Sequence, residues 1–434
     1  MYNQAIATGN PKTFLIIFGL FVFVLPIGNL LWFPLLALCL LGMWHIAKRF
    51  KERSAFSSDE KWFVFLVLAF FVPALISLAN TADMGRSFNY LLTLPLFSLA
   101  GFYSFVSLRR AASLGQIARI ILGLVLIAFA AQIWEFVDPE SPFGHGTGGR
   151  YHGLFASAFG GNLKLPFIAV ALCMFCIGVF IEERAKSLVV LSSVVMIVVV
   201  VLSGTRMVWL SLVYLIGFLI TALIAFRGRE SLRHLLLGLV FLVCATGATI
   251  FAAKDTALME RVNQSLVMFE EFNYQNVNSA LSNRLPMWET TLKMGAENPW
   301  IGTGANAWRY AYPDYVAQDS EGDLVEPDEE QRLRALYLFP HQQVLEVFAS
   351  TGVLGLLGLM FFYLTLLKLA INAYRTRNAA AFFTVLGLCS YFFPFNTHHA
   401  IYSSWITGWL WLWVGIVFGL LNRTLPSASG FAKK

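Results

Sequence analysis

Charged residues are scarce in this sequence. Asp, Glu, Lys and Arg make up 13% of its 434 residues, about half of the ~25% that is usual in soluble domains. Apolar residues make up 58%, above the ~45–50% of soluble domains. These proportions exclude a soluble enzyme, a nucleic-acid-binding domain and a disordered chain. The formal net charge of +6 is therefore expected to set membrane orientation rather than to attract nucleic acid.

Several motifs of soluble chemistry are missing. The first apolar run, 14–25, has no small-residue cleavage site and continues through Pro26 into a second run, so we expect a helical hairpin rather than a removable leader. The Gly-rich stretch 144–153 lacks the Gly-Lys-Ser/Thr ending of a nucleotide-binding loop. Cys173 and Cys176 form a C-x-x-C, but their neighbours are apolar and no second pair lies nearby. We therefore predict that both cysteines pack in the core.

Long apolar runs are what the sequence has instead. A membrane-spanning helix needs about 20 mostly apolar residues. Breaks at polar residues, glycine and proline divide the chain into twelve such segments, which predicts an all-α integral membrane protein with about twelve transmembrane helices. The predicted spans cover residues 13–28, 30–47, 60–79, 88–108, 114–137, 163–181, 187–203, 206–226, 232–252, 341–372, 379–395 and 400–421.

Lysine and arginine alternate from loop to loop. The loops on the side of the N-terminus are basic, as in Lys48 to Arg53, whereas the short loops on the other side are poor in both residues. Because basic loops stay in the cytoplasm, both termini are predicted to be cytoplasmic. The predicted organisation is spans one to nine in 1–252, an outer loop domain in 253–340, spans ten to twelve in 341–421 and a cytoplasmic tail in 422–434.

The outer loop domain carries its own pattern. It holds 14 of the chain's 25 acidic residues and seven basic ones. Ser279 to Glu297 has apolar residues near helical spacing, which predicts an amphipathic helix, and Asp328 to Tyr337 predicts a second, short helix. The acidic stretch between them, 314–330, is expected to be a mobile flap.

Two arginines on the outer side are candidates for binding an anion. Arg206 follows Ser203-Gly204-Thr205 at the outer junction of two spans, where the positive-inside rule disfavours an arginine. Arg284 lies on the predicted amphipathic helix. A guanidinium is permanently charged and binds phosphate oxygens in a bidentate manner. The alternatives are an interfacial anchor for Arg206 and a surface salt bridge for Arg284.

Histidines on the same side are candidates for proton transfer. His341 follows Pro340 and is expected to open the tenth span, where a helix N-terminus would keep the ring neutral and able to accept a proton. That property suits a general base, although a polar helix cap is the simpler alternative. His398 and His399 form a pair at the outer end of the last hairpin.

No metal site is predicted. The histidines lack the spacing of a zinc motif. Two Glu-x-Asp triplets, 321–323 and 326–328, resemble the acidic pairs of metal-dependent glycosyltransferases, but both lie in the acidic stretch, where chance matches are expected.

Three segments together resemble the O-antigen ligase family of bacterial inner membranes. The first is Ser203-Gly204-Thr205-Arg206 at the start of a span. The second is Asn298-Pro299-Trp300-Ile301-Gly302-Thr303-Gly304, and the third is His341-Gln342-Gln343 with Leu345-Glu346 and, further on, Thr351-Gly352-Val353-Leu354-Gly355. Their order, the outer loop and the number of spans also agree with the family. One departure is Gln342, where the family commonly has asparagine.

The resemblance implies a GT-C-like polytopic glycosyltransferase with a periplasmic active site. Members of the family transfer a finished O-antigen glycan from undecaprenyl pyrophosphate to a terminal sugar of lipid A–core, without a divalent metal or other cofactor and with inversion at the anomeric carbon. In these roles, His341 is the expected general base, and Arg206 and Arg284 are expected to stabilise the leaving pyrophosphate.

Further residues are second-tier predictions. Trp288, Trp308 and Tyr337 would stack on sugars or pack in the loop core. Arg150, Lys254 and Arg309 would hold phosphates of lipid A–core or lie on a solvated surface, and His398 and His399 would line the substrate site. The alternative functions are an O-antigen polymerase, a protein O-oligosaccharyltransferase of the same superfamily and a transporter or flippase, which usually shows repeat symmetry that is not evident here.

Overall fold

The structure is a bundle of helices. The computed structural model describes residues 9–111, 113–138, 140–143, 150–155, 165–227, 257–319, 338–392, 394 and 399–423. Within these ranges the chain is helical and has no strand. Seven of the described helices are long and apolar enough to cross a membrane, and four shorter apolar helices accompany them. The predicted all-α, multi-pass membrane protein is therefore confirmed, whereas the total of twelve spans and the GT-C-like comparison stay predictions.

The apolar helices coincide with every predicted span except 232–252, which lies outside the described residues. They are α1 (Pro11–Val24), α2 (Trp32–Lys51), α3 (Ser58–Ile76), α4 (Met84–Leu108), α5 (Gly115–Val137), α6 (Leu165–Glu182), α7 (Lys186–Leu202), α8 (Arg206–Arg227), α15 (Gln343–Arg375), α16 (Ala379–Tyr391) and α17 (Ser404–Leu421). Short 3₁₀ turns are η1 (Gly28–Leu31), η2 (Ser77–Asn80) and η3 (Gly153–Phe155).

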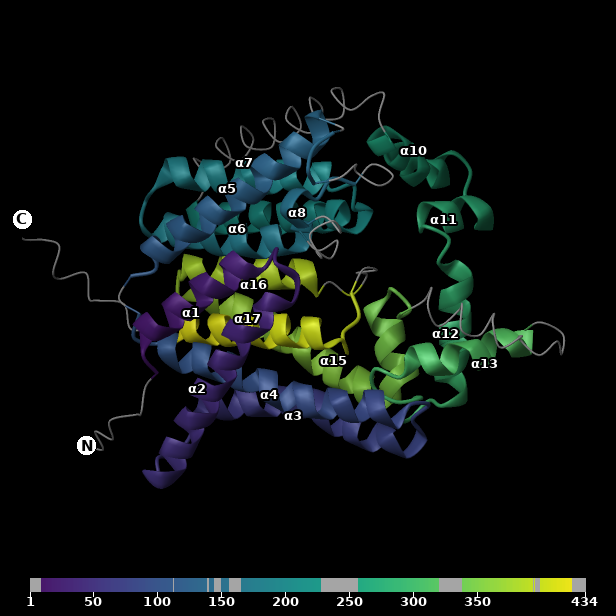
Figure 1. Ribbon diagram of the computed structural model, residues 1–434, viewed down its shortest axis with the longest axis horizontal. Coiled ribbons are helices and arrows are strands. Elements are labelled where there is room, and N and C mark those ends of the chain that lie inside the picture. Colours follow the sequence, from purple (N-terminus) through teal and green to yellow (C-terminus); the bar gives the residue numbers. More distant parts are fainter. Residues whose placement is uncertain are drawn as a thin grey trace, which may run out of the picture.

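The helices form layers, with the loop domain at one end. In Figure 1, α5 to α8 lie on one side, α1, α16 and α17 lie in the middle, and α2 to α4 lie on the other side. The described loop-domain helices gather at the right-hand end of this view. They are α10 (Ala257–Glu270), α11 (Tyr274–Ala280), α12 (Leu285–Glu297) and α13 (Trp308–Asp319).

Helix α17 is the centre of the core. Its Trp409, Trp411 and Trp413 are almost completely buried. It packs against α4 at Gly101 and Gly415, where a Cβ on Gly415 would overlap the Gly101 carbonyl oxygen. Small residues allow such backbone contact between membrane helices.

Two predictions about local packing were tested by the fold. Cys173 and Cys176 are both buried in α6, which confirms that they pack in the core. The amphipathic helix predicted from Ser279 is wrong in its first part, because Ser282 and Asn283 have φ angles of 62° and 59° and α12 begins only at Leu285. The predicted helix 328–337 lies outside the described residues.

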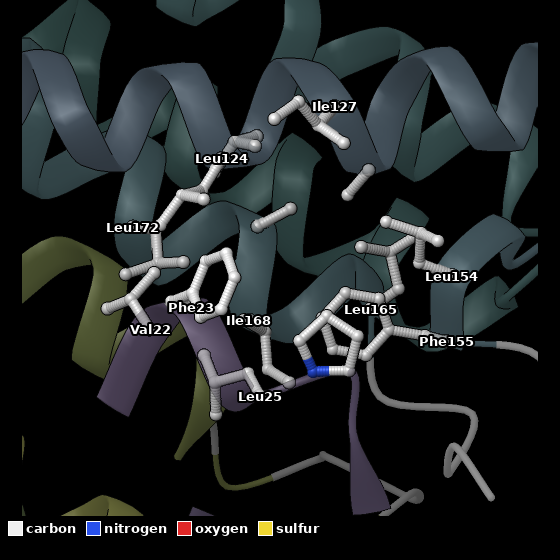
Figure 2. A pocket seen from close by; sticks show the side chains of 14 residues that line it. Val22, Phe23, Leu25, Leu124, Ile127, Leu154, Phe155, Leu165, Ile168 and Leu172 are labelled. Carbon is white, nitrogen blue, oxygen red and sulfur yellow. The ribbon is translucent and has the colours of Figure 1, made fainter. Parts of the chain in front are cut away.

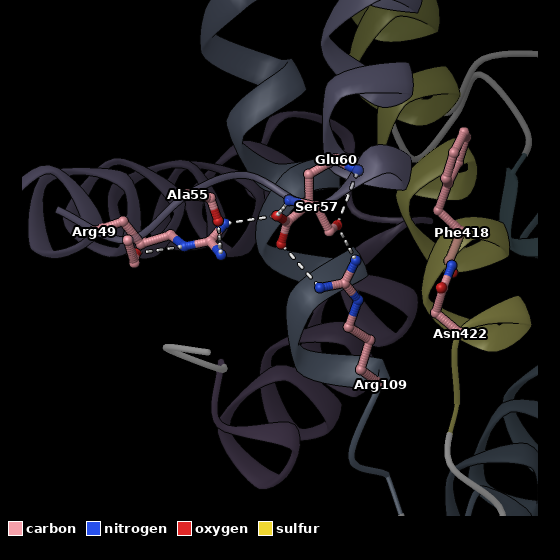
Figure 3. Close-up of polar contacts among 8 residues, drawn as sticks. Arg49, Ala55, Ser57, Glu60, Arg109, Phe418 and Asn422 are labelled. Atoms are coloured by element: carbon pink, nitrogen blue, oxygen red, sulfur yellow. Dashed lines mark hydrogen bonds and ion pairs between the residues drawn. The ribbon is translucent and has the colours of Figure 1, made fainter. Parts of the chain in front are cut away.

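The end of the bundle opposite the loop domain holds buried ion pairs, and we call it the ion-pair end. The Glu60 carboxylate lies 2.9 Å from Arg49 and 2.9 Å from Arg109 (Figure 3). Glu60 also forms a capping box with Ser57 at the start of α3. The carboxylate therefore joins the last turn of α2, the start of α3 and the residue after α4.

Candidate active site

A tight turn between α7 and α8 places Arg206. Helix α7 ends at Leu202, residues 203–205 reverse the chain, and α8 begins at Arg206. Gly204 has a φ angle of 59°, a left-handed conformation that glycine adopts without a Cβ clash. The turn therefore sets Arg206 at the end of a helical hairpin, on the side of the loop domain.

The Arg206 guanidinium holds the loop domain. Its Nη1 donates to the carbonyl oxygens of Ser279 at 3.2 Å and Ala280 at 2.7 Å, at the end of α11, and its Nη2 donates to the side-chain oxygen of Gln264 on α10. The Nε–H is buried and has no hydrogen-bond partner within the described part of the chain. Since buried donors are usually satisfied, this N–H is available for an incoming oxygen atom.

Two polar side chains on α5 hold the segment 150–155. The side-chain amide of Gln132 donates to the Tyr151 carbonyl at 2.8 Å. The buried Glu135 carboxylate accepts the backbone N–H groups of residues 152 and 153, each at 2.6 Å. A short segment between α5 and α6 is thus fixed by groups that the sequence analysis did not single out.

The same segment brings Arg150 to the α7–α8 turn. The backbone N–H of Tyr151 donates to the Leu202 carbonyl at 3.2 Å, directly before the turn that carries Arg206. Burial lowers the pKa of Arg150. The Arg150 Nε–H is buried and has no hydrogen-bond partner among the described residues.

Arg284 is fixed by the loop before α12. Asn278 accepts the backbone N–H of Asn283 at 2.7 Å through its own carbonyl, and that of Leu285 at 3.0 Å through its side chain. Arg284 lies between these two anchored residues, as the N-cap residue of α12.

The three arginines form an electrostatic cluster. Burial lowers the pKa of Arg284 to about 10, and the positive charges of Arg150 and Arg206 act in the same direction. The guanidinium groups of three separate segments, which carry a permanent positive charge, therefore interact with one another. An anion bound here would relieve both the repulsion and the loss of hydration. We call Arg150, Arg206 and Arg284 the arginine cluster.

His341 lies before α15 rather than inside it. Its φ angle is 53°, and Gln342 caps the helix by accepting the Leu345 backbone N–H at 2.6 Å. Helix α15 begins at Gln343, two residues later than the predicted start of the tenth span. The His341 ring is half-buried and lies 4.2 Å from the Phe339 ring, centroid to centroid.

Trp288 connects His341 with the arginine cluster. Its backbone N–H donates to the Arg284 carbonyl at 3.0 Å, and its indole N–H donates to the Pro340 carbonyl at 2.9 Å. One turn of α12 and one hydrogen bond therefore separate Arg284 from the residue before His341. The predicted base and one of the predicted cations belong to the same structural unit.

The start of α15 is tied to the segment before α17. The Gln342 side chain donates to the Pro394 carbonyl at 3.0 Å. The buried Glu346 carboxylate accepts the backbone N–H of Ile401 at 2.9 Å. The first of these bonds holds the residue after His341, whereas Trp288 holds the residue before it.

Two sequence motifs, residues 298–304 and the break in α15 at Gly352, meet in a contact that we call the joint, and this contact supports the site. Helix α15 breaks at Gly352, whose φ and ψ angles are 63° and −159°, so the predicted continuous span 341–372 is interrupted. The freed carbonyls of residues 349 and 350 accept the N–H groups of Thr303 at 2.8 Å and Gly304 at 2.9 Å. A Cβ on Gly352 would overlap the Trp300 backbone. The segment 298–304 thus replaces the hydrogen bonds that the break removes.

The remaining predicted site residues have varied positions. Trp308 is buried, stacks on Tyr312 at 4.5 Å and donates to the Thr291 hydroxyl, so it packs in the loop core. His399 is 2% exposed and lies 4.4 Å from the Tyr391 ring, which favours packing over sugar binding. The other predicted residues, Tyr337, Lys254 and His398, lie outside the described residues.

An apolar pocket adjoins the segment that carries Arg150. It opens between α1, α5 and α6, and Leu154 and Phe155 of η3 form part of its wall (Figure 2). The other residues lining the pocket are Val22, Phe23, Leu25, Pro26, Leu124, Val125, Ile127, Ala128, Leu165, Ile168, Ala169 and Leu172.

The described chain holds no group of three or more His, Cys, Asp or Glu side chains that could bind a metal ion.

Sequence reasoning missed Gln132, Glu135 and Asn278. A glutamine and a glutamate near the end of an apolar run are signals that a buried polar contact exists, because such groups are rare inside membrane helices unless they have partners. The sequence does not say which backbone groups they meet.

Comparison with known proteins shows what this chain is similar to. An uncharacterized protein of Haemophilus influenzae is 24% identical over 342 residues, which cover 76% of this chain and 77% of that protein. The family model described as O-antigen ligase matches residues 191–360. That range contains Arg206, Arg284, His341 and the joint at Gly352. The resemblance of this chain to the O-antigen ligase family is thereby confirmed over the part that carries the candidate active site.

Proposed function

We propose that the protein is an O-antigen ligase. It transfers an O-antigen glycan from undecaprenyl pyrophosphate to a terminal sugar of lipid A–core, at the periplasmic face of the bacterial inner membrane, and both of its termini are cytoplasmic. The family match supports the class of substrate. The arginine cluster is the observation that carries the proposal, because three half-buried cations from separate segments suit a pyrophosphate.

The proposed reaction is a direct displacement. The acceptor hydroxyl oxygen attacks the anomeric carbon while its proton passes to the His341 imidazole. The bond between the anomeric carbon and the pyrophosphate oxygen breaks, and its electron pair leaves with undecaprenyl pyrophosphate. The arginine cluster stabilises the negative charge that grows on this oxygen, without a divalent metal. Attack opposite the leaving group inverts the anomeric carbon.

The pocket in Figure 2 suits the lipid part of the donor. Leu154 and Phe155 lie only four and five residues after Arg150, so a pyrophosphate at the arginine cluster would have an apolar wall close by. We propose that the first isoprene units of undecaprenol occupy this pocket. Burial of apolar surface there would add to the affinity that the arginines provide.

Reconstituted transfer tests the proposal. Purified protein, undecaprenyl-pyrophosphate-linked O-antigen and lipid A–core are combined in the presence of EDTA, and wild type is compared with His341→Ala. Wild type is expected to produce a ladder on lipid A–core, and the variant is expected to be slower by about 10²–10⁴-fold, the usual contribution of a general base. Thermal unfolding of both proteins controls for folding.

Other outcomes would replace the proposal. Extension of the lipid-linked glycan without use of lipid A–core would identify a polymerase. Transfer to a protein acceptor would identify a protein O-oligosaccharyltransferase, and movement of donor across a vesicle membrane without transfer would identify a transporter. Equal rates for wild type and His341→Ala would remove the base assignment in any of these cases.

A further inference from the structure

A second pair of arginines lies at the loop-domain end, outside the arginine cluster. The Nε–H of Arg86, on the first turn of α4, donates to the Tyr310 hydroxyl at 3.2 Å. The Cζ atoms of Arg86 and Arg309 lie 5.9 Å and 5.3 Å from the centroid of the same Tyr310 ring. Two cations from helices far apart in the sequence therefore share one aromatic ring.

Backbone contacts hold these helices together. The Ser87 hydroxyl donates to the Ala305 carbonyl at 2.7 Å, and the Ala82 backbone N–H donates to the Thr303 carbonyl at 2.9 Å. These bonds fix the start of α4 against the segment that leads into α13. The fold therefore holds the backbones of both arginines beside the Tyr310 ring.

Neither arginine is neutralised within the described part of the chain. No ion pair involves Arg86 or Arg309 there. Asp83, the acidic residue nearest to Arg86 in sequence, is used as the N-cap of α4 and accepts the Arg86 backbone N–H at 2.7 Å. The Nε–H of Arg309 is buried without a hydrogen-bond partner among the described residues. An anion with oxygen acceptors would satisfy these donors.

The surface next to this pair is apolar. Phe88 and Leu92 on α4 are 53% and 58% exposed, and Leu96 lies one turn further along the same exposed face. A cationic pair at the end of an exposed apolar helix face is complementary to an amphiphile with an anionic headgroup. Free phosphate would match the cationic pair but not the exposed apolar face of α4.

Arg86 and Arg206 lie on different sides of the bundle. Helix α8 packs on α16, α16 packs on α17, and α17 packs on α4, so α16 and α17 separate α8 from α4 (Figure 1). Both sites lie at the loop-domain end. An enzyme with two lipid substrates needs two headgroup sites at one end of its membrane domain, and this arrangement provides them.

We propose that Arg86, Arg309 and Tyr310 bind a phosphate group of the acceptor lipid, whose acyl chains lie along Phe88 and Leu92. This assignment rests on the proposed ligase function. It gives Arg309 the phosphate-binding role that was one alternative from the sequence, and it adds Arg86 as its partner. Phosphate on the acceptor, rather than its terminal sugar, then positions the lipid in the membrane.

Lipid binding without donor tests the proposal. The protein is placed in phosphatidylcholine nanodiscs, and binding of diphosphoryl lipid A is compared with binding of the same lipid after removal of its phosphates. Wild type is expected to prefer the phosphorylated lipid. Arg86→Gln and Arg309→Gln should each weaken its binding about fivefold, and the double variant should have no preference. Arg110→Gln removes an exposed arginine just beyond the other end of α4 and should leave binding unchanged.

Two results would overturn the proposal. One is a double variant that keeps the preference for the phosphorylated lipid while its thermal unfolding matches wild type. The other is phosphatidylglycerol competing as well as diphosphoryl lipid A, which would make the pair a general site for anionic lipids. Because the assay contains no donor, failure of wild type to transfer glycan would overturn the ligase function without affecting this result. In a working transfer assay, the double variant should have a higher KM for lipid A–core than wild type and the same kcat.

Discussion

The two ends of this bundle use arginine in opposite ways. At the ion-pair end, Arg49 and Arg109 share the buried Glu60 carboxylate, and Arg423 pairs with Glu182. At the loop-domain end, the arginine cluster brings three cations together, and the charges on Arg150 and Arg206 act on Arg284.

The difference separates a structural use of charge from a functional one. A buried cation with a carboxylate partner holds helices together and leaves no charge to bind a ligand. Half-buried cations that repel one another disfavour the folded state, and such an arrangement is expected where an anionic ligand will enter. Charge removal at the two ends should therefore have opposite consequences for stability and for transfer.

The largest effect is expected from Glu60→Gln. The change leaves Arg49, which is 1% exposed, buried without its counter-ion, which should destabilise the protein by about 3–5 kcal/mol. Thermal unfolding in detergent measures this loss. Glu183→Gln is the matched control, because Arg119 and Glu183 form a more exposed pair that should contribute less than about 1 kcal/mol. Similar losses for both variants would contradict the structural role given to Glu60.

Arg284→Gln should show the reverse pattern. Transfer is expected to fall by about 10²–10³-fold, as when one donor to a transition-state oxyanion is removed. The melting temperature should fall less than in Glu60→Gln, because the repulsion that Arg150 and Arg206 exert on this charge is also removed. Rates with undecaprenyl-pyrophosphate-linked glycan and melting temperatures on the same preparations provide the comparison, with Arg110→Gln as control. A large loss of stability would mean that Arg284 holds the fold and that the comparison between the two ends is false.

Gly352→Ala tests whether the joint positions the site. The left-handed backbone would be strained by about 1–3 kcal/mol, and the new Cβ would meet the Trp300 backbone. We expect lower stability together with slower transfer. Gly123→Ala is the control, since a Cβ there meets nothing within 4 Å. Unchanged transfer by a destabilised Gly352→Ala protein would show that the joint supports the fold alone.

The smallest effect is expected from Glu135→Gln. Both backbone N–H groups that hold the segment 150–155 donate to the same Glu135 carboxylate oxygen, and a neutral amide oxygen would accept them more weakly, so Arg150 would be placed less accurately. Transfer should fall about tenfold, equivalent to the loss of roughly one hydrogen bond of ~1.5 kcal/mol. The KM for donor should rise with little change in melting temperature. A rate equal to that of wild type would contradict a role of Arg150 in binding the donor.

Most of the fold was predictable from the sequence because the signals are local. An apolar run of about 20 residues becomes a helix in a membrane whatever its neighbours are. Polar residues such as Asn10, Ser57 and Asp83 stand where helices begin and accept the first free N–H groups. The break at Gly352 was not predicted, because the run around it is as apolar as an unbroken helix.

The candidate site was predictable in part. Arg206 and His341 were candidates from motifs, and Arg284 was a candidate from its place on the amphipathic segment. The structure links Arg206 with Arg284 and links Arg284 with His341 through Trp288. Arg150 was assigned to the acceptor, whereas the structure places it with the two arginines proposed to bind the donor. Its place depends on Gln132 and Glu135, whose partners lie 17 to 67 residues away.

The sequence by itself determined the class of protein, the helices and the order of the motifs, since these follow from composition and from spacing along one segment. Only the tertiary structure decided which arginines pair with carboxylates and which form the arginine cluster. It also decided where α15 breaks and which segment supplies the hydrogen bonds that the break removes. Those features depend on contacts between residues far apart in the chain. Such contacts form only when whole helices pack, so no local pattern encodes them.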